Sequence, residues 1–254
     1  MIPRAALALA LACAAPAAQA TPPDQIHVFD ELFGVSDTHV FVLRRSRDNL
    51  GLHDAEMRNT ALVAIDQQTA AEQLWPILRI HSQPDYDKDP DGLTMKTDRL
   101  ALPGAVDPVA KLEELGGRPF SDQPSPDSRI FGYAPNTGNF DGAIWGFTLE
   151  DGTRFNPDPA TLQDSVSGAL DQFAQALGDY PRFGPITARD LLTGPDYGDT
   201  GCSFTQRSLL RVNRDAPPAH LVFVACPPAW AAGHEADVET TVGLWRVVPP
   251  EPRE

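Results

Sequence analysis

The chain has 254 residues, with 20 basic and 35 acidic side chains and a formal net charge of −15. A chain this acidic repels phosphate backbones and anionic lipid headgroups, so we expect neither nucleic acid nor a membrane surface as its partner. The length suffices for one large domain or two small ones. The 25 prolines and 19 glycines favour short elements joined by many turns.

The first 20 residues have the features of a cleaved secretory signal. Arg4 precedes a short apolar run, and the small residues Ala18 and Ala20 stand just before Thr21. The run is shorter than the ~20 residues that a membrane-spanning helix needs. We therefore expect residues 1–20 to be removed and the protein to be periplasmic or secreted, without a membrane after cleavage. An uncleaved anchor and a lipoprotein modified at Cys13 are the alternatives.

In the first third of the chain the pattern predicts a three-stranded meander. The pattern of residues 25–33 is irregular and predicts no strand, and the first strand is predicted at 38–43, where β-branched and aromatic residues are dense. The polar stretch 44–59 predicts a long excursion. Two further strands are predicted at 60–65 and 73–80.

The middle of the chain alternates short elements with turns. A strand is predicted at 98–102, and residues 107–116 predict a short helix, because Asp caps it, Pro begins it and Gly closes it. Residues 117–128 have the composition of a linker. Strands are predicted after it at 129–133 and 142–149.

The strongest helical pattern lies at residues 159–177. Apolar residues recur there at three- and four-residue intervals, after Asp158 as a cap and Pro159 as the first residue. This spacing predicts one amphipathic helix that needs an apolar partner. A short helix is also predicted at 187–192, and a last strand at 238–248.

Strands outnumber helices in this reading, and hairpin connections dominate it. We therefore predict an α+β fold, built mainly on antiparallel β-sheet, with one clear amphipathic helix (about 159–177) and one or two short helices. Residues 21–250 form one globular domain, or two subdomains that meet at the linker near 117–128. The tail 249–254 is expected to be disordered.

Two cysteines remain after removal of the signal, Cys202 and Cys226. Strands are predicted at 208–212 and 219–225, and a hairpin that turns near Arg214 would bring the two cysteines opposite one another. An oxidising compartment makes their pairing the default, so we predict a disulfide. A metal site or a reactive thiol is the alternative, although neither cysteine lies in a C-x-x-C pair.

Residues 87–98 resemble a twelve-residue calcium loop of the EF-hand type. Gly92 provides the sharp turn, and Asp98 replaces the longer glutamate of the last position. The resemblance implies the following oxygen ligands: Asp87, Asp89, Asp91, the carbonyl of Leu93, and Asp98. The cofactor is thus either Ca²⁺ or none. The alternative is an acidic, solvated hairpin loop.

The sequence contains no complete catalytic constellation. Its six histidines are scattered singly, and it lacks the serine-hydrolase elbow and the phosphate-binding glycine motifs. We therefore assign no catalytic residue and predict an exported, periplasmic, non-catalytic binding or accessory domain. Its partner would be a periplasmic protein or a small molecule of unknown identity. The alternative is a secreted hydrolase with acidic active-site residues, stabilised by calcium.

Overall fold

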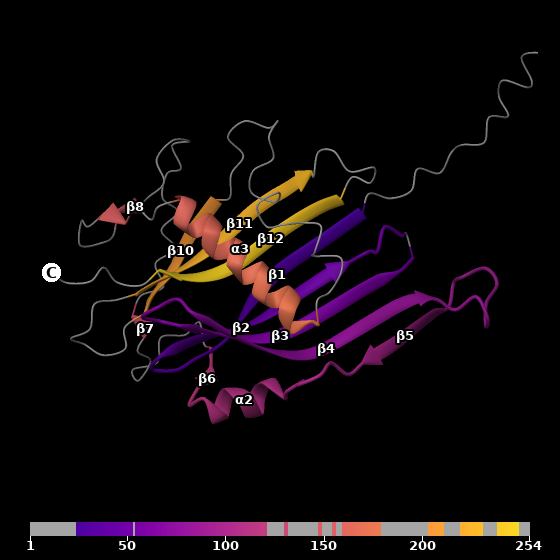
Figure 1. Cartoon of the computed structure of the whole chain (residues 1–254), viewed down its shortest axis with the longest axis horizontal. Helices are drawn as coiled ribbons and strands as arrows, with labels where there is room; N and C mark the ends of the chain where they lie inside the picture. Colours follow the sequence, from indigo (N-terminus) through magenta and orange to yellow (C-terminus); the bar gives the residue numbers. More distant parts are fainter. Residues whose placement is uncertain are drawn as a thin grey trace, which may run out of the picture.

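The computed structural model describes residues 24–52, 54–120, 130–131, 147–148, 154–155, 159–178, 203–210, 219–230 and 238–248. Within these ranges the chain forms one large mixed sheet, a small two-stranded sheet and two helices (Figure 1). The broad prediction of an α+β fold on mainly antiparallel sheet is confirmed. No helix in the described part of the chain has the length and apolar character needed to cross a membrane.

The elements follow one another in a simple order. The first strands are β1 (Asp24–Val35), β2 (His39–Asp48), β3 (Glu56–Asp66), β4 (Glu72–Pro84) and β5 (Met95–Leu100). The later strands are β6 (Arg118–Pro119), β7 (Ile130–Phe131), β8 (Phe147–Thr148), β9 (Arg154–Phe155), β10 (Ser203–Leu210), β11 (Ala219–Trp230) and β12 (Val238–Val248). The helices are α2 (Pro108–Glu114) and α3 (Pro159–Ala176).

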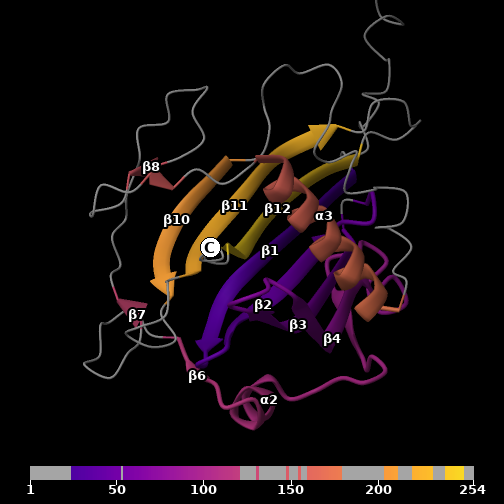
Figure 2. The same cartoon turned by 60° about the vertical axis from the view of Figure 1, so that its left-hand side comes forward.

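The large sheet consists of two antiparallel meanders joined by one parallel pair. Its strand order is β5-β4-β3-β2-β1-β12-β11-β10-β7, and β6 pairs with the end of β1. The parallel pair is β1 with β12, from Asp24 opposite Val238 to Phe29 opposite Gly243. Figure 2 shows the two meanders spreading to either side of β1, with α3 lying across one face.

Both faces of β2 are buried, and they meet different helices. On β2, Val40 and Val42 alternate with Phe41, and all three are buried. Phe41 belongs to a cluster that includes Leu112 of α2. Arg44, two residues beyond Val42, instead reaches α3. Since successive side chains of a strand point to opposite faces, α2 and α3 cover opposite faces of the sheet.

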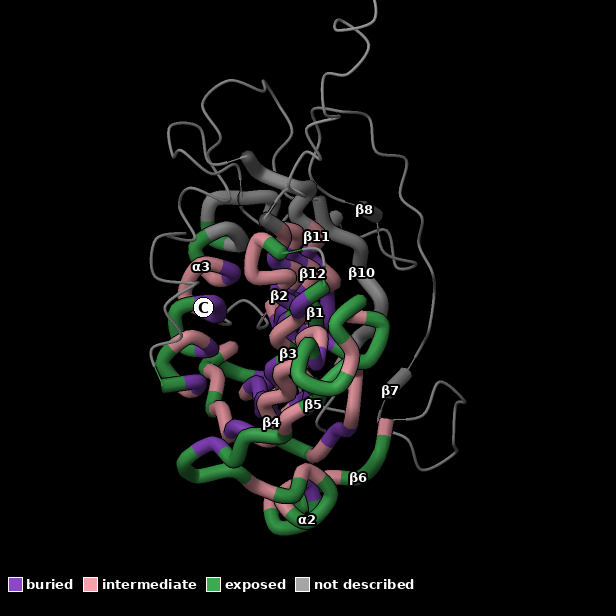
Figure 3. Tube along the Cα trace, turned by 90° about the vertical axis from the view of Figure 1, so that its right-hand side faces the viewer, coloured by how far each residue is buried: buried purple, intermediate pink, exposed green. Residues whose placement is uncertain are grey.

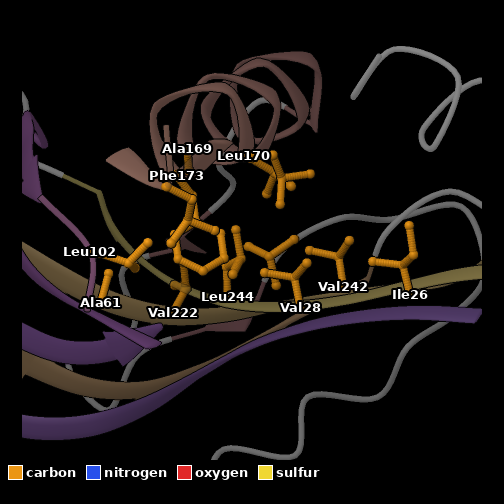
Figure 4. Close-up of a cluster of buried hydrophobic side chains, with 13 residues drawn as sticks. Ile26, Val28, Ala61, Leu102, Ala169, Leu170, Phe173, Val222, Val242 and Leu244 are labelled. Carbon is orange, nitrogen blue, oxygen red and sulfur yellow. The ribbon is translucent and has the colours of Figure 1, made fainter. Parts of the chain in front are cut away.

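The main core lies between α3 and the sheet. Phe173 is fully buried and points toward Val222 and Leu244 of the second meander, as Figure 4 shows. Val28 of β1 and Val242 of β12 lie in the same cluster. Full burial of each such side chain contributes about 1.5–3 kcal/mol. Because the residues of this cluster come from both meanders, α3 packs against both.

The short helix α2 occupies the predicted range and uses the predicted cap. The Asp107 carboxylate accepts hydrogen bonds from the Val109 and Ala110 N–H groups, at 2.9 and 3.0 Å. Leu112 packs so closely on Gly34 that a Cβ atom there would lie 2.7 Å from its Cδ1. This contact ties α2 to the bulged end of β1.

Two predictions in the first meander are wrong. Residues 25–33, predicted to be irregular, belong to β1, and β2 runs on to Asp48 where a polar excursion was predicted. The reason is that Arg44, Ser46 and Asp48 alternate inward and are buried, so the polar stretch continues the strand in register. Polar pairing inside the protein replaces solvation there.

Other predictions fall on residues that are only partly described. In the second meander Ser203 pairs with Ala225, as expected for a hairpin that turns near Arg214, and β10 begins before the predicted strand. Cys202 and the predicted helix at 187–192 lie outside the described residues, as does most of the predicted linker at 117–128. The disulfide and the division into subdomains therefore stay predictions.

Candidate functional site

Four charged side chains meet in the space between the sheet and α3. They form what we call the ion cluster: Asp30 of β1, Arg44 of β2, Glu72 of β4 and Arg246 of β12. Arg44 is completely buried, and Asp30 lies opposite it in the β1–β2 register. The cluster thus joins both meanders.

Arg44 is the centre of the ion cluster. Its Nε and Nη2 donate to the two Asp30 oxygens at 2.8 and 2.9 Å, a bidentate pair. Its Nη1 and Nη2 donate to the Glu72 oxygens at 2.8 and 3.1 Å, and Nη1 also donates to the carbonyl of Ala169 on α3 at 3.2 Å. A single guanidinium therefore links two strands and the helix.

Arg246 completes the charge balance. Its Nη1 donates to Glu72, and its Nε donates to the Ser165 hydroxyl on α3 at 2.7 Å. The Asp30 carboxylate also accepts the backbone N–H of Trp245 at 3.2 Å. Two acids and two bases are thus matched, as buried charges must be.

Burial and ion pairing oppose each other in this cluster. Burial raises the pKa of Asp30 above its ordinary value, even against the attraction of Arg44. Burial also pushes the pKa of Glu72 upward, but the guanidinium groups of Arg44 and Arg246 outweigh it and hold that pKa below its usual value. Burial lowers the pKa of Arg246, whereas Asp30 and Glu72 overcome burial at Arg44 and raise its pKa.

A second, partly buried polar contact holds the carboxyl end of α3. Arg79 of β4 donates from Nη2 to the Leu177 carbonyl at 2.9 Å and from Nε to Asn59 Oδ1 at 2.6 Å. Asn59 in turn donates to the Ser46 hydroxyl at 3.0 Å. A cation at a helix carboxyl end is stabilising, so this contact fixes the helix against the first meander.

An open groove lies at the other end of β4. It has a volume of about 580 Å³, within the range of small-molecule sites. The β2–β3 loop forms one wall and the base of the β4–β5 hairpin forms the other. The lining residues are Leu52, Asp54, Ala55, Gln83, Pro84, Asp85, Tyr86, Asp87 and Lys96.

The groove combines exposed carboxylates with an exposed aromatic ring. Asp54 and Asp87 are exposed, and Tyr86 and Leu52 keep 62% and 54% of their surface open to solvent. The third acid of the lining, Asp85, is buried and forms an ion pair with Lys88 at 3.1 Å. The lining thus exposes carboxylates, apolar surface and one lysine, Lys96, to the same open space.

The residues of the predicted calcium loop are spread over this region. Asp87 lines the groove, whereas Asp89 accepts the Asp91 N–H at 3.1 Å and the Thr94 N–H at 3.0 Å, so its carboxylate closes the loop. Leu93 is 85% exposed.

Asp98 lies outside the loop, on β5 opposite His81, and pairs with Lys96 at 3.5 Å. In the described part of the chain no three His, Cys, Asp or Glu side chains are grouped so as to hold a metal. Calcium binding at residues 87–98 stays a prediction.

Sequence reasoning missed both the ion cluster and the groove. A signal for the cluster was present: Ile26, Val28 and Leu32 alternate, and Asp30 stands at the one charged position of that apolar series. A charged residue on the same face of a strand as buried apolar residues must find an oppositely charged or hydrogen-bonding partner inside the protein. The groove gave no such signal, because its walls meet only through the pairing of distant strands.

Comparison with known proteins adds no constraint. A scan of protein-family models, a search of curated proteins and a search of solved structures each found no match to this chain. The function is therefore inferred from the chemistry of the site.

Proposed function

We propose that the protein is an exported, non-catalytic binding domain whose groove takes a cationic ligand with an apolar part. The observation that carries this proposal is the pair of exposed carboxylates, Asp54 and Asp87, beside the Tyr86 ring and Leu52. Carboxylates attract an ammonium or guanidinium group, and the ring face attracts it further. The net charge of −15 would speed the approach of such a ligand.

The ion cluster does not supply the acids that the alternative of hydrolysis would need. A general acid or base must reach the substrate and exchange a proton with it. Asp30 and Glu72 are buried and held by guanidinium groups, so neither is open to a substrate. A perturbed pKa in such a network serves the fold as readily as it serves catalysis.

The same proposal includes α3 as an amphipathic helix that locks the scaffold. Val166 and Phe173 are buried against the sheet, whereas Asp164 and Asp171 are exposed. The groove walls are the β2–β3 loop and the base of the β4–β5 hairpin, and the ion cluster holds β2 and β4, from which both walls extend. A rigid scaffold lowers the entropic cost of binding.

Export and a disulfide belong to the proposal as well. The signal-like residues 1–20 support export, and the β10–β11 register supports a Cys202–Cys226 bridge: Ser203 follows the first cysteine and pairs with Ala225, which precedes the second. The test is the intact mass of periplasmic material after alkylation with and without reduction. Addition of two alkyl groups without reduction would refute the bridge.

Titration calorimetry at low ionic strength tests the groove, with spermidine and phenethylamine as probes. We expect the mature protein to bind an amine and the double variant Asp54→Asn/Asp87→Asn to bind it at least about tenfold more weakly. The control variant Glu113→Gln/Asp171→Asn removes the same charge from exposed helix positions outside the groove. Equal losses in both variants, or no binding of either amine, would refute the proposal.

The aromatic part of the site has its own test. Tyr86→Ala removes the ring and leaves both carboxylates in place. We expect it to weaken phenethylamine more than spermidine, because only the first ligand brings an apolar ring of its own to the groove. An equal loss for the two amines would mean that the ring acts on the ammonium group only, and no loss for either would assign the affinity to the carboxylates alone.

A further inference from the structure

The strand β5 forms an open edge of the sheet. In the described ranges its strand partner is β4, so the opposite edge of β5 carries main-chain groups without a strand partner there. Met95 and Leu100 are 48% and 43% exposed. The β4–β5 hairpin extends beyond the neighbouring strands in Figure 1, and Figure 3 colours most of it as exposed. Such an edge is a template for pairing with another chain.

The direction of the main-chain groups on β5 follows from one hydrogen bond. The Asp85 N–H donates to the Thr94 carbonyl at 2.8 Å, directly beyond the β4–β5 register that pairs Pro84 with Met95. Thr94 therefore directs its C=O toward β4, whereas its N–H donates to Asp89 in the hairpin loop. Since the direction alternates along an antiparallel strand, Met95, Thr97 and Arg99 direct theirs toward the open edge.

Two side-chain observations agree with this alternation. Thr97 and Ser82 bring their hydroxyls to 3.2 Å, as expected at a non-hydrogen-bonded position, where facing side chains are closest. Pro84, which has no N–H to donate, faces Met95 at another position of the same kind. The outward set is therefore Met95, Thr97 and Arg99.

We propose that β5 pairs antiparallel with β5 of a second copy, about a twofold axis through Thr97. In this register Lys96 lies opposite Asp98 of the partner subunit, and the reverse pair repeats the contact. Thr97 faces Thr97 of the partner subunit, a favourable pair on a sheet. The outward main-chain groups of both copies then bond to each other and form one continuous sheet.

The charges on β5 select this register against its neighbours. An axis at Lys96 would place two lysines opposite each other, and an axis at Asp98 would place two aspartates opposite each other. Like charges directly opposite each other are destabilising, whereas the axis at Thr97 places each lysine opposite an aspartate. Within one copy Lys96 and Asp98 keep 53% and 43% of their side-chain surface open, so they are accessible for this exchange.

The strand is short, so association should be weak and should depend on concentration. This inference does not rest on the proposed ligand, although Lys96 also lines the groove. Pairing would bring Asp98 of the partner subunit to the groove rim and increase its negative charge. The self-complementary charges favour a second copy over an unrelated peptide as the occupant.

Sedimentation equilibrium of the mature chain at sub-millimolar concentration tests the pairing. We expect a dimer whose dissociation constant rises at least about tenfold in Lys96→Asp, and likewise in Asp98→Lys, because each places like charges opposite. The double exchange Lys96→Asp/Asp98→Lys should restore the dimer. As a matched control, Lys88→Asp makes the same charge change at another salt-bridged lysine, away from the edge, and should leave the dimer unchanged.

Disulfide cross-linking tests the register independently. Under mild oxidation Thr97→Cys should cross-link to itself, whereas Met95→Cys and Arg99→Cys should cross-link only when the two variants are mixed. In each single variant the new thiols would lie about 13 Å apart. The parent chain serves as the control for its own cysteines. A monomer at every concentration, an unaffected Lys96→Asp dimer, or self-linking at position 95 equal to that at 97 would overturn the proposal.

Discussion

The two ends of β4 use the same kinds of charged side chain in opposite ways. At its beginning, Glu72 is buried and bound by Arg44 and Arg246. At its end, the strand leads into a groove where Asp54 and Asp87 face solvent. The buried charges therefore hold the strands and α3 together, and in our proposal the exposed charges attract the ligand.

The difference follows from solvation. An unpaired ion in the interior costs several kcal/mol, so the members of the ion cluster depend on one another. On the surface, water and salt screen each charge, and its removal leaves its neighbours nearly unaffected. Substitutions of the charged residues at either end of β4 test this difference.

The largest effect is expected at the centre of the ion cluster. Arg44→Met leaves Asp30 and Glu72 buried with Arg246 as their remaining guanidinium. We expect it to lower the free energy of unfolding by about 3–5 kcal/mol, because it leaves a buried carboxylate without a balancing positive charge. Urea denaturation followed by circular dichroism measures this loss.

A matched double variant separates charge from shape. Arg44→Met/Asp30→Leu removes a complete ion pair and leaves Glu72 balanced by Arg246. We expect it to recover much of the stability lost in the single variant, less about 1 kcal/mol for the Trp245 N–H that loses its acceptor. A double variant no more stable than Arg44→Met would mean that the stability lost in the single variant comes from packing and not from the unbalanced charge.

Local signals predicted several of the elements, but they predicted neither β1 nor the cluster that joins the two meanders. The cap at Asp107 and the dense apolar run at 238–248 are readable within a few residues, and α2 and β12 occupy those ranges. The polar residues after Leu43 were predicted as an excursion, because the partners of Arg44 lie on β1, β4 and α3 and are not visible in the local pattern. The contact from Arg246 to Glu72 spans 174 positions of sequence, and no local pattern contains it.

The β4–β5 loop is held by its own carboxylate, and a moderate loss is expected there. Asp89→Ala removes the acceptor of the Asp91 and Thr94 N–H groups, and we expect a loss of about 1 kcal/mol in unfolding free energy. Melting in EDTA and in millimolar Ca²⁺ tests the same loop as a metal site. A rise of the melting temperature in Ca²⁺ that Asp89→Ala abolishes would support calcium binding at residues 87–98. An unchanged melting temperature would mean that Asp89 serves only to close the turn.

The β3–β4 turn allows a smaller, pH-dependent test. Slight burial works to raise the pKa of Asp66, but the N–H and hydroxyl of Thr69 and the N–H of Gln68 outweigh it and hold the pKa below its ordinary value. The carboxylate therefore adds stability above the unfolded pKa of about 4, and this is lost as the pH falls through the folded value.

Asp66→Asn should accordingly be less stable than the parent at neutral pH, by less than about 1 kcal/mol, because the site is partly exposed. The difference should shrink as the pH falls below about 4. Denaturation midpoints at several pH values measure it. A difference that is constant with pH would show that the ionised form of Asp66 has no special role in the turn.

The smallest effect is expected at the groove. Asp54→Asn/Asp87→Asn removes two exposed carboxylates, and the free energy of unfolding should change by no more than about 0.5 kcal/mol, because neither side chain is buried. The same variant is the one expected to lose amine binding, so stability and binding should separate in one protein. If it instead unfolds as readily as Arg44→Met, the groove acids belong to the scaffold, and the two ends of β4 do not differ in role.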